Sequence, residues 1–132
     1  MTDQPDPTAN NDVLEDVLDL KPVGKPEISF DDFLKLEIKI GTIKSLERVP
    51  DTDKLYQLQV DFGDHSRQIV SGIADRVTPE QLLGKQCPFV TNLAPRVIRG
   101  VESNGMIMAV GTDDAFALLH PHTEIPAGSG VR

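Results

Sequence analysis

Hydrophobic and polar residues alternate along much of the chain after residue 28, as they do in half-buried β-strands. The clearest run is 54–62, where one face collects Tyr56, Leu58, Val60 and Phe62. Residues 36–49 also alternate, but the apolar positions change parity after Gly41, so we expect a β-bulge or a sharp bend there. Further strands are predicted at 66–73, 85–93 and 105–110.

Two short segments interrupt this alternation with helix signals. Ser29 can cap a helical turn, with Asp32 three residues later. In residues 78–84, Thr78 can be the N-cap, Pro79 the first helical residue and Gln81 the capping-box partner, and Gly84 can end the helix. Three strands with a bent first strand, a short helix and two more strands predict an all-β, five-stranded Greek-key barrel, the OB-fold, which commonly binds nucleic acids. Residues 113–120 and 130–132 can add a C-terminal β extension.

The N-terminal segment lacks this pattern. Residues 1–12 are polar and contain proline, and residues 13–18 have only enough apolar positions at helical spacing for one short helix. We therefore divide the 132 residues into an acidic, largely disordered tail at 1–27 and one domain at 28–132.

Charge is unevenly distributed between these two parts. The net charge is −8, and residues 1–27, with seven acidic and two basic residues, contribute −5 of it. Fields between exposed charges fade over about 8 Å at physiological salt, so a local basic cluster in the domain remains compatible with a nucleic-acid partner.

Catalytic and metal-binding patterns are missing from the sequence. The single cysteine, Cys87, lies in a predicted strand and is interpreted as a core residue, and the histidines of the 120–122 segment lack an evident third metal ligand. We predict no catalytic residue, metal or cofactor. No apolar run is long enough for a membrane span and no signal peptide is evident, so we expect a cytoplasmic protein with no membrane partner.

Polar and basic residues gather in the segment 92–104, at the start of the last predicted strand. Arg96 and Arg99 can bind phosphate oxygens, and Asn92 and Ser103 can hydrogen-bond phosphate, the ribose 2′-hydroxyl or base edges. The alternative is that the arginines are solvated loop charges and that 103–104 only forms a turn. Met106 fits either core packing or a role in lining a site.

Several motifs in order along the chain resemble one family. The segments DFLKLEIKIGTI, PDTDKLYQLQVDFG, RQIVSGIA, LLGKQCPFVTNLAPR, RGVESNGMIMA and PHTEIPAGSGVR are similar to the tRNA-binding domain found as a stand-alone protein and in methionyl-tRNA synthetase, as its C-terminal part or β-subunit. The resemblance runs from about residue 28 to 132. It implies a non-catalytic OB-fold that binds tRNA, acts alone or with a methionyl-tRNA synthetase catalytic chain, and pairs as a homodimer through residues 30–36 and the part after Gly111.

The family's binding surface carries over to positions that match its motifs. Asn104 stands where the family usually has Glu, Ala94 stands where it often has Lys, and Lys54 can widen the positive patch. The predicted RNA-binding residues are Lys54, Ser71, Asn92, Arg96, Arg99, Ser103, Asn104, Gly105 and Met106.

The mode of binding is predicted from the aromatic residues. The chain has no Trp and one Tyr, and Tyr56 lies on an apolar strand face, so base stacking is expected to be secondary to phosphate and shape recognition. A secretion-chaperone branch of the same superfamily, which binds unfolded polypeptide as a dimer, is the alternative function. A protein-interaction module docking through the acidic tail is a third.

Overall fold

The computed structural model describes residues 24–132 of the chain. The chain divides into two units between Leu34 and Lys35, which are described here separately. In the first unit, α1 (Phe30–Phe33) begins at Ser29, whose Oγ accepts a hydrogen bond from the Asp32 backbone N–H at 3.1 Å, as its sequence predicts. The expected helix at 13–18 lies outside the described residues, and the 27/28 boundary stays a prediction.

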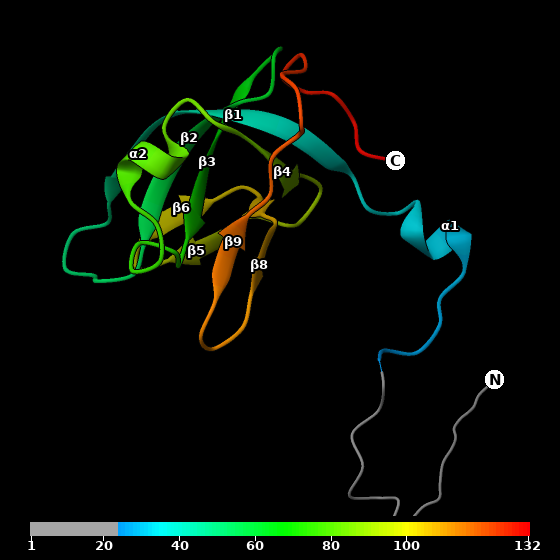
Figure 1. Cartoon of the computed structure of the whole chain (residues 1–132), viewed down its shortest axis with the longest axis horizontal. Coiled ribbons are helices and arrows are strands. Elements are labelled where there is room, and N and C mark those ends of the chain that lie inside the picture. The colour runs from blue at the N-terminus through cyan, green and yellow to red at the C-terminus, as the bar shows by residue number, and fades with distance from the viewer. Residues whose placement is uncertain (1–23) are drawn as a thin grey trace, which may run out of the picture. The chain divides into compact units, whose positions relative to one another are not determined.

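The second unit is built mainly of strands (Figure 1). Their bounds are β1 (Ile38–Arg48), β2 (Tyr56–Asp61), β3 (Ser66–Ser71), β4 (Gln86–Val90), β5 (Arg96–Ile98), β6 (Val101–Ser103), β7 (Met106–Ile107), β8 (Ala109–Gly111) and β9 (Phe116–Leu118), with α2 (Pro79–Leu82) between β3 and β4. Five strands form one antiparallel sheet in the order β3-β2-β1-β4-β7. The all-β class, the five-stranded sheet and the helix between the third and fourth strands are thus confirmed.

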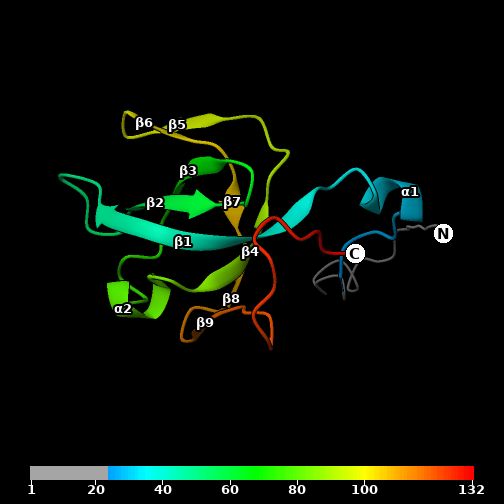
Figure 2. The same ribbon diagram turned by 90° about the horizontal axis from the view of Figure 1, so that it is seen from above.

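The sheet curls so that its two edges approach each other. Asn104, just before β7, donates its backbone N–H to the carbonyl of Gln68 in β3 at 2.8 Å. The two remaining pairs, β5–β6 and β8–β9, are short hairpins that lie on opposite sides of β1 (Figure 2). No helix in residues 24–132 has the length and apolar character needed to cross a membrane.

The irregularity in β1 differs from the prediction in position. The register against β2 slips between Ile43 and Ser45, so the bulge is at Lys44 and not at Gly41. Gly41 has another role, because a Cβ there would lie 2.4 Å from Val60 Cγ1 and 2.8 Å from Phe62 Cε1. The change in the parity of apolar positions at Gly41 therefore marks the place where β1 lies close to β2.

The core lies inside the curl of the sheet and under α2. The predicted apolar face of β2 is buried throughout, and it packs with Ile43, Ile69, Leu82, Cys87 and Phe89. In α2, Gln81 Oε1 accepts the Thr78 backbone N–H at 2.8 Å, as the capping box predicts.

The chain after β9 is fastened to the start of the sheet. The Ile40 N–H donates to the Ser129 carbonyl at 2.9 Å, and the Val131 N–H donates to the Ile38 carbonyl at 2.8 Å. Gly130 thus bridges to Lys39 on the side of β1 away from β4, as a short form of the predicted extension.

Candidate nucleic-acid interface

The β5–β6 hairpin was not predicted as strands, and it carries both arginines of the 92–104 segment. Arg96 pairs with Ser103 and Ile98 pairs with Val101, so Arg99 and Gly100 form a two-residue turn. Both have positive φ, 53° and 82°, as a type I′ hairpin turn requires. Asparagine or glycine usually occupies the first of these positions, which is why the turn escaped the sequence analysis.

The tip of this hairpin contacts the β1–β2 loop. The Arg99 Nη2–H group donates to the Asp51 carbonyl at 3.2 Å. Arg99 and Asp51, with φ of 53° and 63°, are the two non-glycine residues in 24–132 that adopt left-handed backbone. This conformation costs about 1–2 kcal/mol for an L-residue, so the contact joins two loop tips that both have an unfavourable backbone conformation.

One face of the hairpin forms the wall of a groove of about 310 Å³. The groove gathers five of the nine predicted residues, namely Ser71, Arg96, Ser103, Gly105 and Met106. Its lining also includes residues that the sequence analysis missed: Leu55, Val70, Gly72, Leu93, Ala94 and Ile98. Gly72, Leu93 and Ala94 lie within the motifs that carry the family resemblance, but their residue types alone gave no chemical reason to select them.

Two of the five gathered residues serve the fold. Ser103 is buried, and its Oγ accepts the Val70 N–H at 2.9 Å and donates to the Gly105 carbonyl at 3.2 Å. Gly105 has φ of 141°, and a Cβ there would lie 3.0 Å from Ile69 Cδ1 and 3.3 Å from the Val90 carbonyl oxygen. The glycine is therefore required by internal packing, whatever it also allows a ligand to do.

Met106 is exposed in the groove and does not pack in the core. Its neighbour Ile107 is buried, whereas Met106 is 48% exposed. The apolar alternation of the last predicted strand thus points the other way, with Met106 facing the groove and Ile107 facing the core.

Asn92, Arg99, Asn104 and Lys54 do not line the groove. The Asn92 carboxamide accepts the Glu37 N–H at 2.8 Å and donates to the Lys35 carbonyl at 2.7 Å, so it fastens the start of β1. Lys54 is exposed in the β1–β2 loop, beyond Asp51 and Thr52.

The groove arginine is electrostatically available. Within residues 24–132, Lys39 pairs with Glu37 and His65 Nδ1–H donates to the Asp64 carboxylate, whereas neither Arg96 nor Arg99 is paired with a carboxylate there. The Arg67 guanidinium, by contrast, is already bonded within the fold, because it donates to the Thr91 carbonyl and to His65 Nε2.

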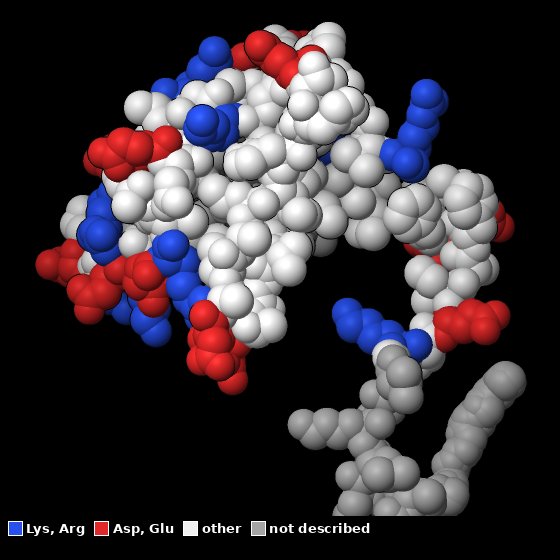
Figure 3. Space-filling model, viewed as in Figure 1, with Lys and Arg blue, Asp and Glu red and all other residues white. Residues whose placement is uncertain are grey.

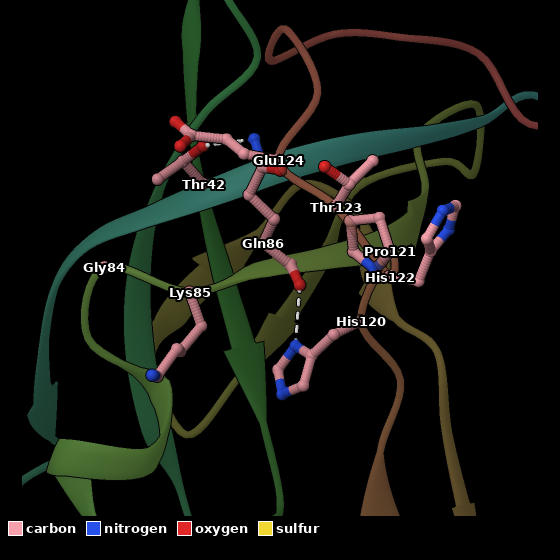
Figure 4. A pocket seen from close by; sticks show the side chains of 9 residues that line it. All are labelled: Thr42, Gly84, Lys85, Gln86, His120, Pro121, His122, Thr123 and Glu124. Atoms are coloured by element: carbon pink, nitrogen blue, oxygen red, sulfur yellow. Dashed lines mark hydrogen bonds between the residues drawn. The ribbon is translucent and has the colours of Figure 1, made fainter.

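A second hollow lies beside β4 and the chain after β9 (Figure 4). His120 Nδ1–H donates to the Gln86 carbonyl at 2.7 Å, and the Gln86 amide group bonds the N–H and the carbonyl of Ile125 at 3.1 and 2.7 Å. These polar groups hold the C-terminal segment in place. Among the described residues no three His, Cys, Asp or Glu side chains come together as a metal site.

Cys87 lies next to this hollow but is inaccessible. Its side chain is fully buried, and burial raises the pKa of the thiol from 9.0 to about 11. A thiol with that pKa is protonated at neutral pH, which is the opposite of a reactive thiolate.

The face that bears β8–β9 shows little charge (Figure 3). Large parts of this face are uncharged, and toward α2 basic side chains alternate with acidic ones. This face therefore lacks the continuous positive surface that a phosphate backbone would need.

Comparison with known proteins places this chain in a family. The family profile described as "Putative tRNA binding domain" matches residues 38–130. Methionine--tRNA ligase of Methanospirillum hungatei is 51% identical over 118 residues, which are 89% of this chain and 18% of that protein. The chain thus spans less than a fifth of the curated relatives it matches.

Solved structures agree in fold. A methionyl-tRNA synthetase related protein from Pyrococcus horikoshii superposes with a TM-score of 0.78 at 41% identity, over 82% of this chain and all of that one. The chaperone CsaA from Bacillus anthracis gives a TM-score of 0.72 at 31% identity, over 81% of this chain and all of that one. With its profile match, its relatives and its fold in agreement, the chain belongs to the tRNA-binding domain family.

Proposed function

We propose that this chain is a non-catalytic tRNA-binding module that holds folded tRNA on the face formed by the β5–β6 hairpin and the groove beside it. Arg96 supplies a guanidinium without a carboxylate partner in the described part of the chain, and Ser71 supplies a hydroxyl in the same groove. This unpaired arginine in the groove is the observation that carries the proposal, because a folded RNA presents phosphates at its surface.

Arg99 extends the surface to the hairpin tip. One of its guanidinium nitrogens bonds the Asp51 carbonyl, which leaves further donors and the full positive charge for a second phosphate. The hydrogen bond to Asp51 positions that charge beside the β1–β2 loop.

The test is a binding assay with unfractionated, Mg²⁺-folded tRNA at several salt concentrations. The double variant Arg96→Ala, Arg99→Ala should bind more weakly and lose about 0.7–0.9 in the slope of log K against log salt for each phosphate contact removed. The control is Arg76→Ala, Lys85→Ala, which removes the same charge beside α2 and β9. Equal loss in both variants, with folding retained, would show that only net charge matters and would refute the proposed face.

We also propose that two copies pair and that the module serves a methionyl-tRNA synthetase. Phe30 in α1 and Leu34 just after it are 71% and 59% exposed, and Val110 and Val131 in the second unit are 53% and 45% exposed. Exposed apolar side chains in these short segments favour a partner surface that covers them. Light scattering should give twice the 14.4 kDa chain mass, and copurification with a synthetase catalytic chain tests the second association.

Binding of unfolded polypeptide is the second candidate. The observation in its favour is the similarity to CsaA together with the exposed apolar side chains of the groove, Leu93 and Met106. A reduced, alkylated polypeptide that displaces tRNA from the protein at comparable concentration would support this function.

A further inference from the structure

The groove beside the β5–β6 hairpin has two unlike walls. Arg96 and Ser71 provide a charge and a hydroxyl, and neither side chain has a hydrogen-bond partner within residues 24–132. Leu93 and Met106 lie on the same groove and remain 42% and 48% exposed. Phosphate binding makes use of the polar groups but gains nothing from an exposed apolar surface.

Apolar surface gathered in a hollow with a few polar groups is the usual composition of a small-ligand site. Single exposed leucines on a convex surface need no explanation, but here the half-buried Leu55 and Ile98 continue the apolar surface inside the groove. The volume of about 310 Å³ is at the lower end for such sites. It suits one flat group rather than a continuous stretch of chain.

Gly72 gives an independent indication. Its φ lies outside the left-handed region, and a Cβ there would meet only Leu55 Cδ2, at 3.8 Å, an ordinary contact. Neither backbone conformation nor internal packing therefore requires glycine at this position. What the missing side chain does provide is open space in the groove wall, as at sites where a backbone lies close to a ligand.

We propose that this groove takes one unstacked nucleobase of the bound RNA. The base faces pack against Leu93 and Met106, the adjoining phosphate lies at the Arg96 guanidinium, and the Ser71 hydroxyl bonds the ribose or a base edge. Unstacked bases occur in the loops of folded RNAs, where proteins pack side chains on their faces. The inference rests on the proposed function, and it adds a base contact to recognition by phosphate and shape.

The chemistry also favours limited sequence preference. No aromatic side chain lines the groove, so the base is held by aliphatic and thioether contacts. Every base has faces that can make such contacts, and Ser71 supplies a single hydroxyl for discrimination. The site therefore selects for an extruded nucleotide more than for a particular base.

The first arm of the test uses small probes on the wild-type full chain. Backbone amide NMR spectra are recorded during titration with AMP, UMP, ribose 5-phosphate and inorganic phosphate. Both nucleotides should shift the Gly72 and Met106 amides and bind at least fivefold more tightly than ribose 5-phosphate. Equal shifts and affinities for AMP and ribose 5-phosphate would overturn the base site.

The second arm fills the groove. Gly72→Val should weaken binding of folded tRNA about tenfold without changing its salt slope, because the phosphate contacts remain. Gly130→Val is the control, since Gly130 also lacks left-handed φ and has open space around its Cβ position, but lies beside β1. Thermal melting verifies that both variants fold, and if Gly72→Val does not, the first arm decides alone.

The two failures are distinguishable. If tRNA binds with strong salt dependence but Gly72→Val binds it as tightly as wild type does, the base site is wrong and the proposed function stands. If tRNA does not bind the wild-type protein at all, the proposed function itself is wrong. Displacement of AMP by a reduced, alkylated polypeptide that shifts the same amides would overturn the base site in favour of an apolar peptide side chain.

Discussion

The carboxamide of Asn92 spans the gap between the end of β4 and the residues before β1. It makes one hydrogen bond to each of Lys35 and Glu37, which lie more than 50 positions earlier in the sequence. Hydrogen bonds of this kind contribute about 0.5–1.5 kcal/mol each. At this residue the side chain stabilises the entry of the chain into the sheet.

We therefore predict a stability effect for Asn92→Ala. The variant should lose about 1–2 kcal/mol of unfolding free energy, since water replaces the two hydrogen bonds only in part. Well below its melting temperature it should bind tRNA within about threefold of wild type. Urea unfolding followed by circular dichroism, with tRNA binding at 10 °C, checks both. A large affinity loss in a stable variant would return Asn92 to the RNA surface.

Asn92 and Arg96 show how far residue type alone can predict a binding site. Both are polar residues in one segment, and both were predicted to bind RNA. Arg96 lies in the groove without a carboxylate partner in the described residues, whereas Asn92 is committed to a carbonyl and an N–H that only the folded chain brings to it. A motif identifies the neighbourhood of a site, but it does not say which polar groups are already used inside the fold.

Cys87 allows a chemical prediction at the same scale. Because burial raises the pKa of its thiol to about 11, the native chain should react with a disulfide reagent at pH 8 only as fast as it opens. In urea the thiol should react at once. As the raised pKa requires, native stability should also fall as pH rises from 9 toward 11, where only the unfolded chain ionises. Fast stoichiometric labelling of the native protein would contradict this account.

At the scale of elements, the packing of β1 requires a glycine at position 41. Gly41→Ala places a methyl group against Val60 and Phe62, both of which are buried, so neither can move away freely. We predict a loss of about 1–3 kcal/mol, as for other overpacked cores. Chemical denaturation measures it, and Gly130→Ala, whose Cβ position is open, is the matched control. Equal stability of the two variants would mean that β1 and β2 separate easily.

The junction between the start of β1 and the end of β4 also titrates. The Thr91 hydroxyl donates to the Glu37 carboxylate at 2.7 Å and holds the pKa of that carboxyl below its usual 4.5, and the nearby Lys39 and Arg67 charges act in the same direction. A lowered pKa gives stability that is complete above pH 4.5 and is lost as pH falls through the lower native value.

Glu37→Gln isolates this contribution, because the amide oxygen can still accept from Thr91 while the charge is gone. Between pH 7 and pH 3 the wild type should lose more unfolding free energy than the variant, and the two should converge at the acid end. Denaturant melts at a series of pH values provide the comparison. Parallel pH profiles would show that the carboxylate adds nothing.

Elements were predictable in proportion to the strength of their local pattern. β2 was predictable from its alternation and α2 from its capping residues, since each signal lies within a few residues. The β5–β6 hairpin was missed because its strands have three residues each and its turn begins with arginine. Its position is set by contacts such as Arg99 with Asp51, which local sequence does not encode.

For the whole molecule, the distribution of charge matters more than its sum. The net charge of −8 would oppose an RNA partner, but five of these charges belong to residues 1–27. At low salt the repulsion from such a segment reaches far, and near physiological salt it fades over about 8 Å.

A chain lacking residues 1–27 should therefore associate with tRNA several-fold faster at 20 mM salt and at the same rate as the full chain at 300 mM. Stopped-flow fluorescence with labelled tRNA measures both rates. An unchanged rate at 20 mM would mean that the acidic residues have a role unrelated to RNA binding. A slower rate would suggest that they assist binding.

The fastening of residues 128–131 along β1 has a consequence for how this unit can be joined to other polypeptides. Since Gly130 bridges to Lys39, residues near the two ends of the unit 35–132 lie side by side at the start of β1, the central strand of the sheet. Units whose ends adjoin are readily permuted, or inserted into a host chain as a self-contained cassette. The unit can therefore be inserted into a larger chain without rearranging any strand of its sheet.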